Sequence, residues 1–270
     1  MKGLRVRCLT AGASGTPVLL LHGGGIDSAC FSYKHVIEPL ALNHRVFAPD
    51  WPGCGKSDKP DVEHTMKFYI DFLESLMDAL QLERVILVGI SLGGGAALGF
   101  TLRSPQRVER LVLVNSYGLG DEVAWGRLGY LLIHAPLVDN LTYALLRRSR
   151  RMVRWSLYNL VYDRRVVTEE MVEEVYRLVN KPGAGRAFSS FQKNEVGWNR
   201  LHTSFADRLH EIRVPVLIVH GENDGVVPVA WACSAHERIA GSELRVLPGC
   251  GHMPTREYPG GFNRLVGRFL

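Results

Sequence analysis

Residues 85–98 constrain the fold more than any other part of the sequence. Four consecutive apolar residues, VILV, run directly into the pentapeptide GISLG at 89–93, and small residues continue to position 97. An uninterrupted apolar run is typical of a strand buried on both faces of a parallel sheet. The glycines permit a sharp turn after the strand, and the residues beyond it favour a helix. We therefore predict strand, tight turn and helix, with the Ser91 hydroxyl exposed on strained backbone at the turn.

The same kind of apolar run recurs along the chain and alternates with amphipathic stretches. Residues 66–80 and 261–270 show the helical pattern, with apolar side chains three or four positions apart. Strands that alternate with helices form a mostly parallel sheet that the helices cover. We therefore predict an α/β fold with a mostly parallel central sheet flanked by helices. The expected strands are Val18–Leu21, Val46–Ala48, Val85–Val88, Leu111–Val114 and Val216–Val219.

The pattern changes in the middle of the 270-residue chain. Residues 117–209 read as helices and polar loops without a convincing core strand, and Thr168 followed by two Glu is typical of a helix start. We predict an α/β core formed by residues 1–116 and 210–270, and a helical cap insertion formed by residues 117–209. Aromatic residues that would pack within the insertion or line a pocket are Trp125, Tyr130, Trp155, Tyr158, Tyr162 and Trp198.

The charge balance is weakly basic. The chain has 32 Lys and Arg against 27 Asp and Glu, a net charge of +5, which does not by itself indicate a nucleic-acid partner. In the densest basic cluster, Arg147, Arg150, Arg151 and Arg154 have the spacing of one helical face, either a solvated face or a partner site. We predict a protein without a nucleic-acid partner, and the role of this cluster stays open.

Cysteine usage and hydropathy bear on localisation. The five cysteines are odd in number and show no Cys-x-x-Cys spacing, which fits reduced thiols better than a disulfide scaffold. Charged residues interrupt the start of the chain too often for a signal-peptide core, and no later apolar run reaches membrane-spanning length. The sequence predicts a cytoplasmic protein without a membrane partner, present as a monomer or homodimer.

Ser91 is the candidate nucleophile of the glycine-rich turn. A serine hydroxyl is a poor nucleophile at neutral pH, so it needs a positioned base, and the base needs a partner that fixes its tautomer. A glycine-rich helix start can instead bind phosphate. No Lys-Ser or Lys-Thr pair follows these glycines, which excludes a Walker-type loop. We therefore predict nucleophilic catalysis by Ser91.

Two later loops supply the candidate acid and base. After the strand at 216–219 comes HGEND, in which Asp224 is the preferred acid and Glu222 the competitor. An Asp before Gly is also a common turn residue. After the next predicted strand, at 244–247, comes PGCGHMP, a loop that presents His252. The chain order Ser, Asp, His occurs in known catalytic triads, so we predict that Asp224 orients His252, the general base.

A second glycine-rich turn follows the strand at 18–21. In HGGG at 22–25, backbone N–H groups can reach an oxyanion, because glycine lets the chain approach a substrate closely. We assign the oxyanion hole to the N–H groups of Gly24 and Leu92; a purely structural turn is the alternative. Losing one such donor typically costs about 3 to 4 kcal/mol of transition-state stabilisation. We expect His22 to shape the loop without reacting.

Together these motifs resemble the α/β-hydrolase superfamily along nearly the whole chain. They are HGGG at 22–25, DWPGCGKSD at 50–58, GISLG at 89–93, Asp224 and His252. The resemblance implies an α/β-hydrolase fold with a helical cap, no cofactor, and attack on a carbonyl carbon of a small-molecule substrate. Members with an Asp nucleophile act on haloalkanes or epoxides, and Ser91 excludes those subfamilies.

Within the superfamily, HGGG, the Thr168 segment and FNRL at 262–265 are similar to the hydrolases of meta-cleavage products, which break carbon–carbon bonds. Those enzymes often carry Asn before the nucleophile and Trp after the catalytic His, where this chain has Ile90 and Met253. Esterases and lactonases share the matching pieces. The sequence therefore predicts first a carboxylesterase or lactonase acting on a small to medium, mostly apolar ester through an acyl-enzyme.

Two other functions remain open. The first is carbon–carbon hydrolysis of 2-hydroxy-6-oxo-dienoates, for which Arg177 or Arg186 could hold the substrate carboxylate. The second is a ligand receptor on the same fold with very slow turnover. A receptor would turn over far below the range of roughly 1 to 1000 per second that is usual for enzymes, so a rate measurement separates the two classes.

Overall fold

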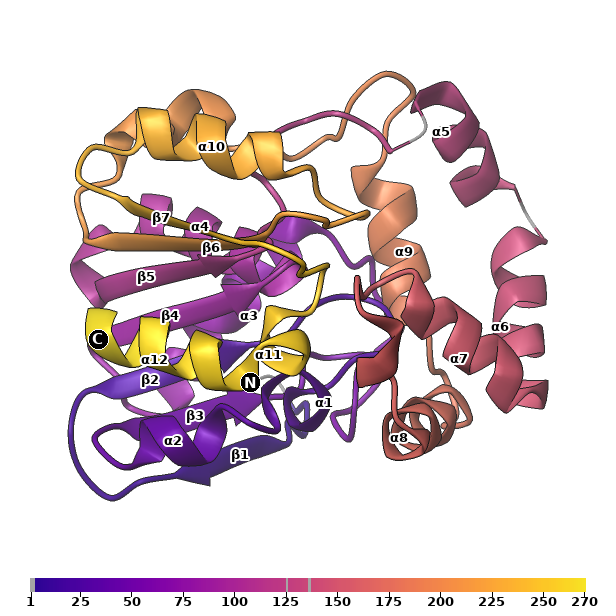
Figure 1. Cartoon of the computed structure of the whole chain (residues 1–270), viewed down its shortest axis with the longest axis horizontal. Coiled ribbons are helices and arrows are strands. Elements are labelled where there is room, and N and C mark those ends of the chain that lie inside the picture. Colours follow the sequence, from indigo (N-terminus) through magenta and orange to yellow (C-terminus); the bar gives the residue numbers. More distant parts are fainter. Residues whose placement is uncertain (1–2, 125, 136) are drawn as a thin grey trace.

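A seven-stranded sheet forms the centre of the computed structural model, which describes residues 3–124, 126–135 and 137–270 (Figure 1). Its strands are β1 (Cys8–Ala11), β2 (Pro17–Leu21), β3 (Arg45–Pro49), β4 (Val85–Ile90), β5 (Val108–Val114), β6 (Val216–Gly221) and β7 (Glu243–Leu247). Their spatial order is β1-β3-β2-β4-β5-β6-β7, and every neighbouring pair is parallel except β1 with β3. The predicted mostly parallel sheet is confirmed.

Helices cover both faces of this sheet, which explains the uninterrupted apolar runs. They are α1 (Ala29–Tyr33), α2 (Ile37–Ala41), α3 (Met66–Ala79), α4 (Leu92–Arg103), α10 (Val229–Arg238), α11 (Pro254–Glu257) and α12 (Pro259–Phe269). In β4, Leu87 packs in a cluster with α3, α4 and α10, whereas Val88 packs in another cluster with α1, α2 and α12. Successive side chains of a strand point to opposite faces, so a strand covered on both sides is apolar at every position.

The helices begin close to the positions that the sequence indicates. Thr65 caps the first turn of α3 with its hydroxyl, and Thr168 caps α8 (Glu169–Val179) in the same way. The last helix, α12, begins two residues before the predicted start, because Pro259 is tolerated in the first turn of a helix. Among the helices described, none is both long and apolar enough to cross a lipid bilayer.

The strand at one edge of the sheet, β1, has no counterpart among the strands predicted from the sequence. It pairs antiparallel with β3, from Cys8 opposite Pro49 to Ala11 opposite Val46. None of its four residues is fully buried. An edge strand is only partly covered by neighbouring elements, so the sequence CLTA can form a strand without the apolar run that identifies the central strands.

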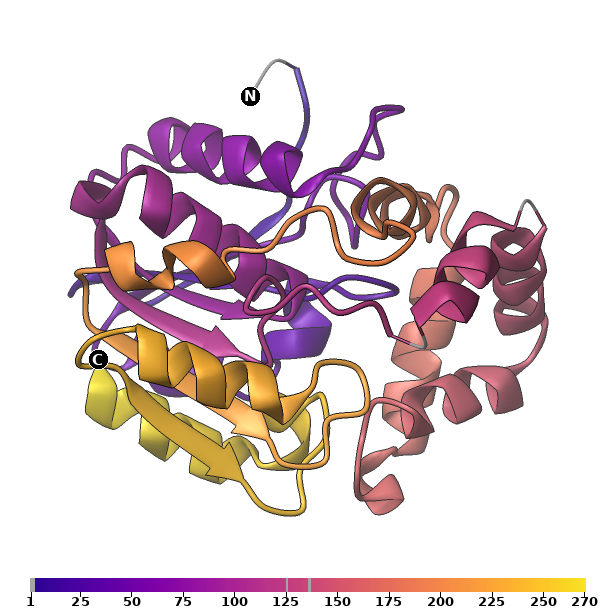
Figure 2. The ribbon, with the colours of Figure 1, turned by 90° about the horizontal axis from the view of Figure 1, so that it is seen from above.

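Between β5 and β6 the chain forms helices that lie to one side of the sheet (Figures 1 and 2). They are α5 (Gly126–His134), α6 (Val138–Arg148), α7 (Arg150–Tyr158), α8 and α9 (Arg186–Glu195), with short 3-10 turns at Arg164–Val166 and Ala206–Glu211. Apolar residues of α7 and α8 pack against Phe31 and Met253 of the sheet-bearing part. The division at 117 and 209 stays a prediction, and Trp125 lies outside the described residues.

Candidate active site

Ser91 stands on a sharp turn between β4 and α4. Its backbone has φ 52° and ψ −119°, a conformation that costs a non-glycine residue on the order of 1–3 kcal/mol. The neighbouring backbones are in close contact: a Cβ added to Gly89 would lie 2.4 Å from Gly93 O, and one added to Gly93 would lie 2.1 Å from Leu21 O. Only glycine fits these two positions. The strand, turn and helix predicted for this segment are present, and close packing holds the serine in strained geometry.

Asp224 and His252 are hydrogen-bonded to one another. The distance between Asp224 Oδ2 and His252 Nδ1 is 2.7 Å, and Oδ1 accepts from the backbone N–H groups of Val226 and Val227 at 2.7 and 3.1 Å. Burial opposes ionisation of Asp224, but these hydrogen bonds outweigh it and lower the pKa of the carboxyl below its ordinary range. The side chain of Glu222, the competing acid, is exposed. The structure therefore places Asp224, and not Glu222, on the imidazole.

Asn115 is a residue of this site that sequence reasoning missed. It follows β5 with φ 43°, and its Nδ2 donates to Asp224 Oδ2 at 2.5 Å and to Gly251 O at 3.0 Å. Its Oδ1 accepts from Gly221 N at 3.2 Å. Asn tolerates left-handed backbone better than most residues, so an Asn directly after a central parallel strand is the signal that could have indicated it. Asn115 joins the two loops that carry the acid and the base.

Ser91 and His252 both line a cavity of about 350 Å³. Its walls come from the loop at 23–27, from the end of β4 and from the helical segment between β5 and β6. The hydrogen bonds of the described residues do not include one between Ser91 and His252, although both line the cavity; such contacts are often loose before a substrate binds. Apolar residues on the wall opposite include Phe31, Leu146, Val153, Leu157, Val175 and Val179.

The two predicted oxyanion donors lie close to one another, since a Cβ added to Gly24 would lie 3.5 Å from Leu92 Cδ1. Gly24 lines the cavity, and Leu92 follows the serine as the first residue of α4. Neither backbone N–H has an acceptor among the hydrogen bonds of the described residues, so both remain free to bind a substrate oxygen. A Cβ added to Gly24 would lie 2.5 Å from the ring of Phe188. A side chain at position 24 would therefore displace the ring of Phe188 from this wall of the cavity.

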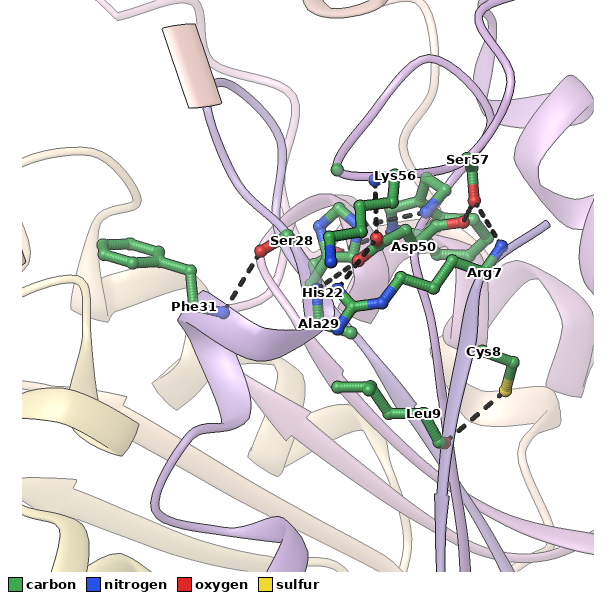
Figure 3. A network of polar contacts seen from close by, with 12 residues as sticks. Arg7, Cys8, Leu9, His22, Ser28, Ala29, Phe31, Asp50, Lys56 and Ser57 are labelled. Carbon is green, nitrogen blue, oxygen red and sulfur yellow. Dashed lines mark hydrogen bonds and ion pairs between the residues drawn. The ribbon is translucent and has the colours of Figure 1, made fainter. Parts of the chain in front are cut away.

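His22 and Asp50 support the loop that carries these glycines (Figure 3). His22 is fully buried; its Nε2 accepts from Trp51 N at 3.0 Å, so Nδ1 carries the proton and donates to Gly23 O at 2.8 Å. The buried carboxylate of Asp50 accepts from Ala29 N at 2.9 Å, beyond the other end of the loop. Hydrogen bonds to Asp50 and from Trp51 thus hold both ends of the loop, and both ring nitrogens of His22 form hydrogen bonds to the backbone.

Arg177 and Arg186 do not line the cavity that contains Ser91. On α8, Val175 and Val179 face the cavity, and Arg177, two positions from each, points away into a separate charged cleft of about 520 Å³. No Lys or Arg occurs among the described residues that line the cavity of Ser91. Neither of the two arginines that could have held a substrate carboxylate is therefore part of the cavity wall beside the serine.

The basic cluster on α6 and α7 is engaged mainly within the chain. Arg150 Nε donates to Glu173 Oε2 at 2.8 Å, and Arg154 pairs with Glu169 on α8. Arg147 donates to backbone carbonyl groups at 179 and 184. These contacts join neighbouring helices, which favours a structural role over a partner site. Among the residues described, no group of three or more His, Cys, Asp or Glu has the arrangement of a metal site.

Comparison with known proteins finds similarity along nearly the whole chain. The family model described as alpha/beta hydrolase fold matches residues 16–255. The 2-hydroxy-6-oxo-2,4-heptadienoate hydrolase of Pseudomonas putida is 34% identical over 260 residues, which cover 95% of this chain and 90% of that protein. Among solved structures, the meta-cleavage product hydrolase of Pseudomonas fluorescens IP01 is 31% identical, with a TM-score of 0.84 over 99% of this chain and 94% of that one. An N-acyl homoserine lactone degrading enzyme is 26% identical, with a TM-score of 0.78 over 100% and 98%.

Proposed function

Because the chain belongs to the α/β-hydrolase fold family, we propose that it is a serine hydrolase that cleaves the carbon–carbon bond of a 2-hydroxy-6-oxo-dienoate. The observation that carries this proposal is similarity over almost the whole chain to proteins named as hydrolases of such compounds. The sequence placed ester hydrolysis first and this reaction second, and the comparisons favour the second. The cavity at Ser91, with its largely apolar lining, suits a substrate that consists of one conjugated chain with an apolar end.

The first half of the proposed reaction breaks the carbon–carbon bond. His252 removes the proton of the Ser91 hydroxyl, and the serine oxygen attacks the ketone carbon at position 6 of the substrate in its diketo form. The backbone N–H groups of Gly24 and Leu92 bind the oxyanion that develops. When the tetrahedral intermediate collapses, the electron pair of the bond between carbons 5 and 6 passes into the conjugated 2-keto acid. This dienolate takes from His252 the proton that came from Ser91, and it leaves as a 2-hydroxydienoate.

The second half releases the acyl group from Ser91. His252 takes a proton from water, and the resulting hydroxide attacks the acyl-enzyme, again with the oxyanion held at Gly24 and Leu92. The bond between the acyl carbon and Ser91 Oγ then breaks, and His252 returns the proton to the serine oxygen. Asp224 keeps the imidazole in the tautomer that has Nε2 free to accept a proton, and stabilises the imidazolium. The products are one carboxylic acid and one hydroxydienoate for each water consumed. No step requires a cofactor.

We also propose that residues 117–209 act as the cap of this site. Helices α6, α7, α8 and α9 each contribute residues to the wall of the cavity. The apolar part of that wall suits the acyl end of the substrate, and Thr142 and Gln192 provide neutral hydrogen-bond donors for its oxygen atoms. Because the described lining holds no cationic side chain, we expect the substrate carboxylate to bind through such neutral donors or at the mouth of the cavity.

Ester or lactone hydrolysis is the second candidate. It is favoured by the absence of Lys and Arg from the described cavity lining and by the likeness to the lactone-degrading enzyme. The same nucleophile, base and oxyanion donors would serve, with an alkoxide as leaving group in place of a dienolate. A neutral ester does not need a partner for a carboxylate, so this function makes fewer demands on the cavity.

The ratio of two specificity constants tests the proposal. We would measure kcat/KM for 2-hydroxy-6-oxohepta-2,4-dienoate, by the loss of its absorbance, and for p-nitrophenyl esters of increasing chain length. We expect the dienoate to exceed the best ester by at least about tenfold, a difference of about 1.4 kcal/mol in transition-state binding. Ser91→Ala should abolish both activities, and Ser75→Ala, at an exposed position of α3, should change neither. Brisk ester turnover without loss of the dienoate would establish the second candidate instead.

A further inference from the structure

Glu257 contacts the backbone of the loop that carries His252. It is the last residue of α11, and its Oε1 accepts hydrogen bonds from Gly251 N at 2.9 Å and from Met253 N at 3.2 Å. Gly251 and Met253 are the two residues that flank the histidine. One carboxylate oxygen therefore holds the loop on both sides of the candidate base.

The other oxygen of Glu257 fastens this loop to the helical segment. Oε2 accepts from Tyr162 N at 2.7 Å, and His252 N donates to Leu160 O at 2.8 Å. A Cβ added to Gly251 would lie 2.7 Å from Tyr162 N, so the two backbones are in direct contact. Leu160 itself lines the cavity of Ser91. Hydrogen bonds and close packing thus join the loop of the base to one wall of the cavity.

The carboxylate of Glu257 has three backbone N–H groups as its main partners, and the Cys250 thiol donates to Oε1 at 3.8 Å. Among the ion pairs of the described residues, none involves this side chain, which is only partly exposed. Hydrogen bonds from N–H groups to a carboxylate are roughly twice as strong as those between neutral groups, and Glu257 accepts three of them from backbone N–H groups. The carboxylates of Asp224 and Glu257 therefore act on different parts of the loop that carries His252. Asp224 fixes the orientation of the ring, and Glu257 fixes the place of the loop.

We propose that Glu257 is a positioning residue, which sets the distance between His252 and Ser91 and couples it to the wall of the cavity at Leu160. The described hydrogen bonds include none between Ser91 and His252, so the position of the loop decides how closely the imidazole approaches the serine. The three bonds to Glu257 hold the loop on both sides of the histidine and tie it to Tyr162. The inference rests on the proposed role of His252 as base, and it does not depend on which substrate is cleaved.

The test compares Glu257→Ala and Glu257→Gln with the wild type and with Glu237→Ala, an exposed carboxylate on α10. Two rates are measured: labelling of Ser91 by a fluorophosphonate, and turnover of the dienoate. We expect Glu257→Ala to lower both the labelling rate and kcat by about 30- to 100-fold while KM stays within about twofold, because misplacing a base by about 1 Å costs that much. The amide oxygen of Gln can still accept from Gly251 and Met253, so Glu257→Gln should recover to within about fivefold of the wild type. Glu237→Ala should match the wild type.

Hydrogen exchange separates positioning from general stability. In Glu257→Ala, amides at 158–164 and 249–258 should exchange faster, whereas those at 85–95, around Ser91, should not change. Wild-type labelling and kcat in Glu257→Ala, or equal losses in the Ala and Gln variants that follow the unfolded fraction, would overturn the proposal. Should the Ala variant not fold, Glu257→Asp, which withdraws the charge by one methylene, carries the same test with an expected loss of about tenfold. A wild type that leaves the dienoate intact would refute the proposed function alone, because labelling still reports on Glu257.

Discussion

The serine and the histidine of this site are held in place by different means. Ser91 is fixed through its backbone. Gly89 and Gly93 bring backbone against backbone, Ser91 N donates to Val114 O at 2.9 Å, and no side-chain hydrogen bond caps the turn. His252 is fixed by polar contacts, through Asp224 on its ring and Asn115 on its loop. Where close packing holds a residue, an added atom should destabilise the fold. Where hydrogen bonds hold a residue, removal of a donor or acceptor should lower the catalytic rate while the fold remains.

The largest effect should come from the polar half of this comparison. Asp224→Asn should lower kcat by about 10⁴-fold, because an amide favours the wrong imidazole tautomer and cannot stabilise the imidazolium. The melting temperature should change little, because the substitution removes a charge without changing the size of the side chain. Glu222→Gln, on the exposed competitor in the same loop, is the matched control and should stay within about twofold. A loss below tenfold in Asp224→Asn, or an equal loss in the control, would contradict the assignment of the acid.

Substitutions at the closely packed turn around Ser91 should change the stability of the protein. Gly93→Ala places a methyl group against the backbone at Leu21, and we expect it to lower the free energy of unfolding by about 3 kcal/mol or more, or the melting temperature by about 6–12 °C. Gly267→Ala on α12 meets no atom within 4 Å and should instead add about 0.5–1 kcal/mol. Thermal unfolding of the two variants checks both signs. Equal stability of the two variants would show that the turn is not held by close packing.

Asn115 tests whether the acid and base loops are tied together. Asn115→Gly keeps a residue that tolerates positive φ and removes the amide that donates to Asp224 and Gly251. A hydrogen bond to a charged group contributes about 1.5–3 kcal/mol. If this energy is lost in the transition state, kcat/KM should fall by about 10- to 100-fold. Steady-state kinetics on the dienoate measure this loss. Unchanged kinetics would confine Asn115 to packing.

The smallest effect concerns acid stability. The folded protein lowers the pKa of Asp224 below its ordinary value of 3.8, so this carboxylate binds protons more weakly in the folded state than in the unfolded state. The stability it contributes is present above pH 3.8 and is lost as pH falls through the lowered pKa. Urea unfolding of wild type and Asp224→Asn between about pH 3 and pH 7 should give a difference that shrinks toward the acid end. A difference independent of pH would contradict the shift.

The serine turn and the acid–base pair could be predicted from the sequence, and the side chains that hold the loops of that pair could not. Glycine at 89 and 93 next to an apolar run has few explanations other than close backbone contact, and Asp224 and His252 follow strands in a known order. Asn115 and Glu257 act through hydrogen bonds to backbone groups far away in the sequence, at Gly221 and Tyr162. Such contacts depend on the three-dimensional approach of loops and leave no periodic pattern.

The helical segment shows the same limit. Its helices could be predicted from their caps, as at Thr168, but the direction of each side chain could not be assigned without knowing which face meets the core. Arg177 was one of two arginines that could have held a substrate carboxylate, and the structure places Val175 and Val179, not Arg177, in the wall of the cavity. Charge suggested the wrong residue, because helical position decides which side chains reach the cavity.

Product analysis of a single reaction tests the central claim most directly. The protein is incubated with 2-hydroxy-6-oxohepta-2,4-dienoate, and acetate and 2-hydroxypenta-2,4-dienoate are quantified by mass spectrometry in parallel with Ser91→Ala. Hydrolysis at the bond between carbons 5 and 6 predicts equal amounts of the two fragments, formed by the wild type and not by the variant. A dienoate that stays intact while an ester is cleaved at the same serine would contradict carbon–carbon hydrolysis.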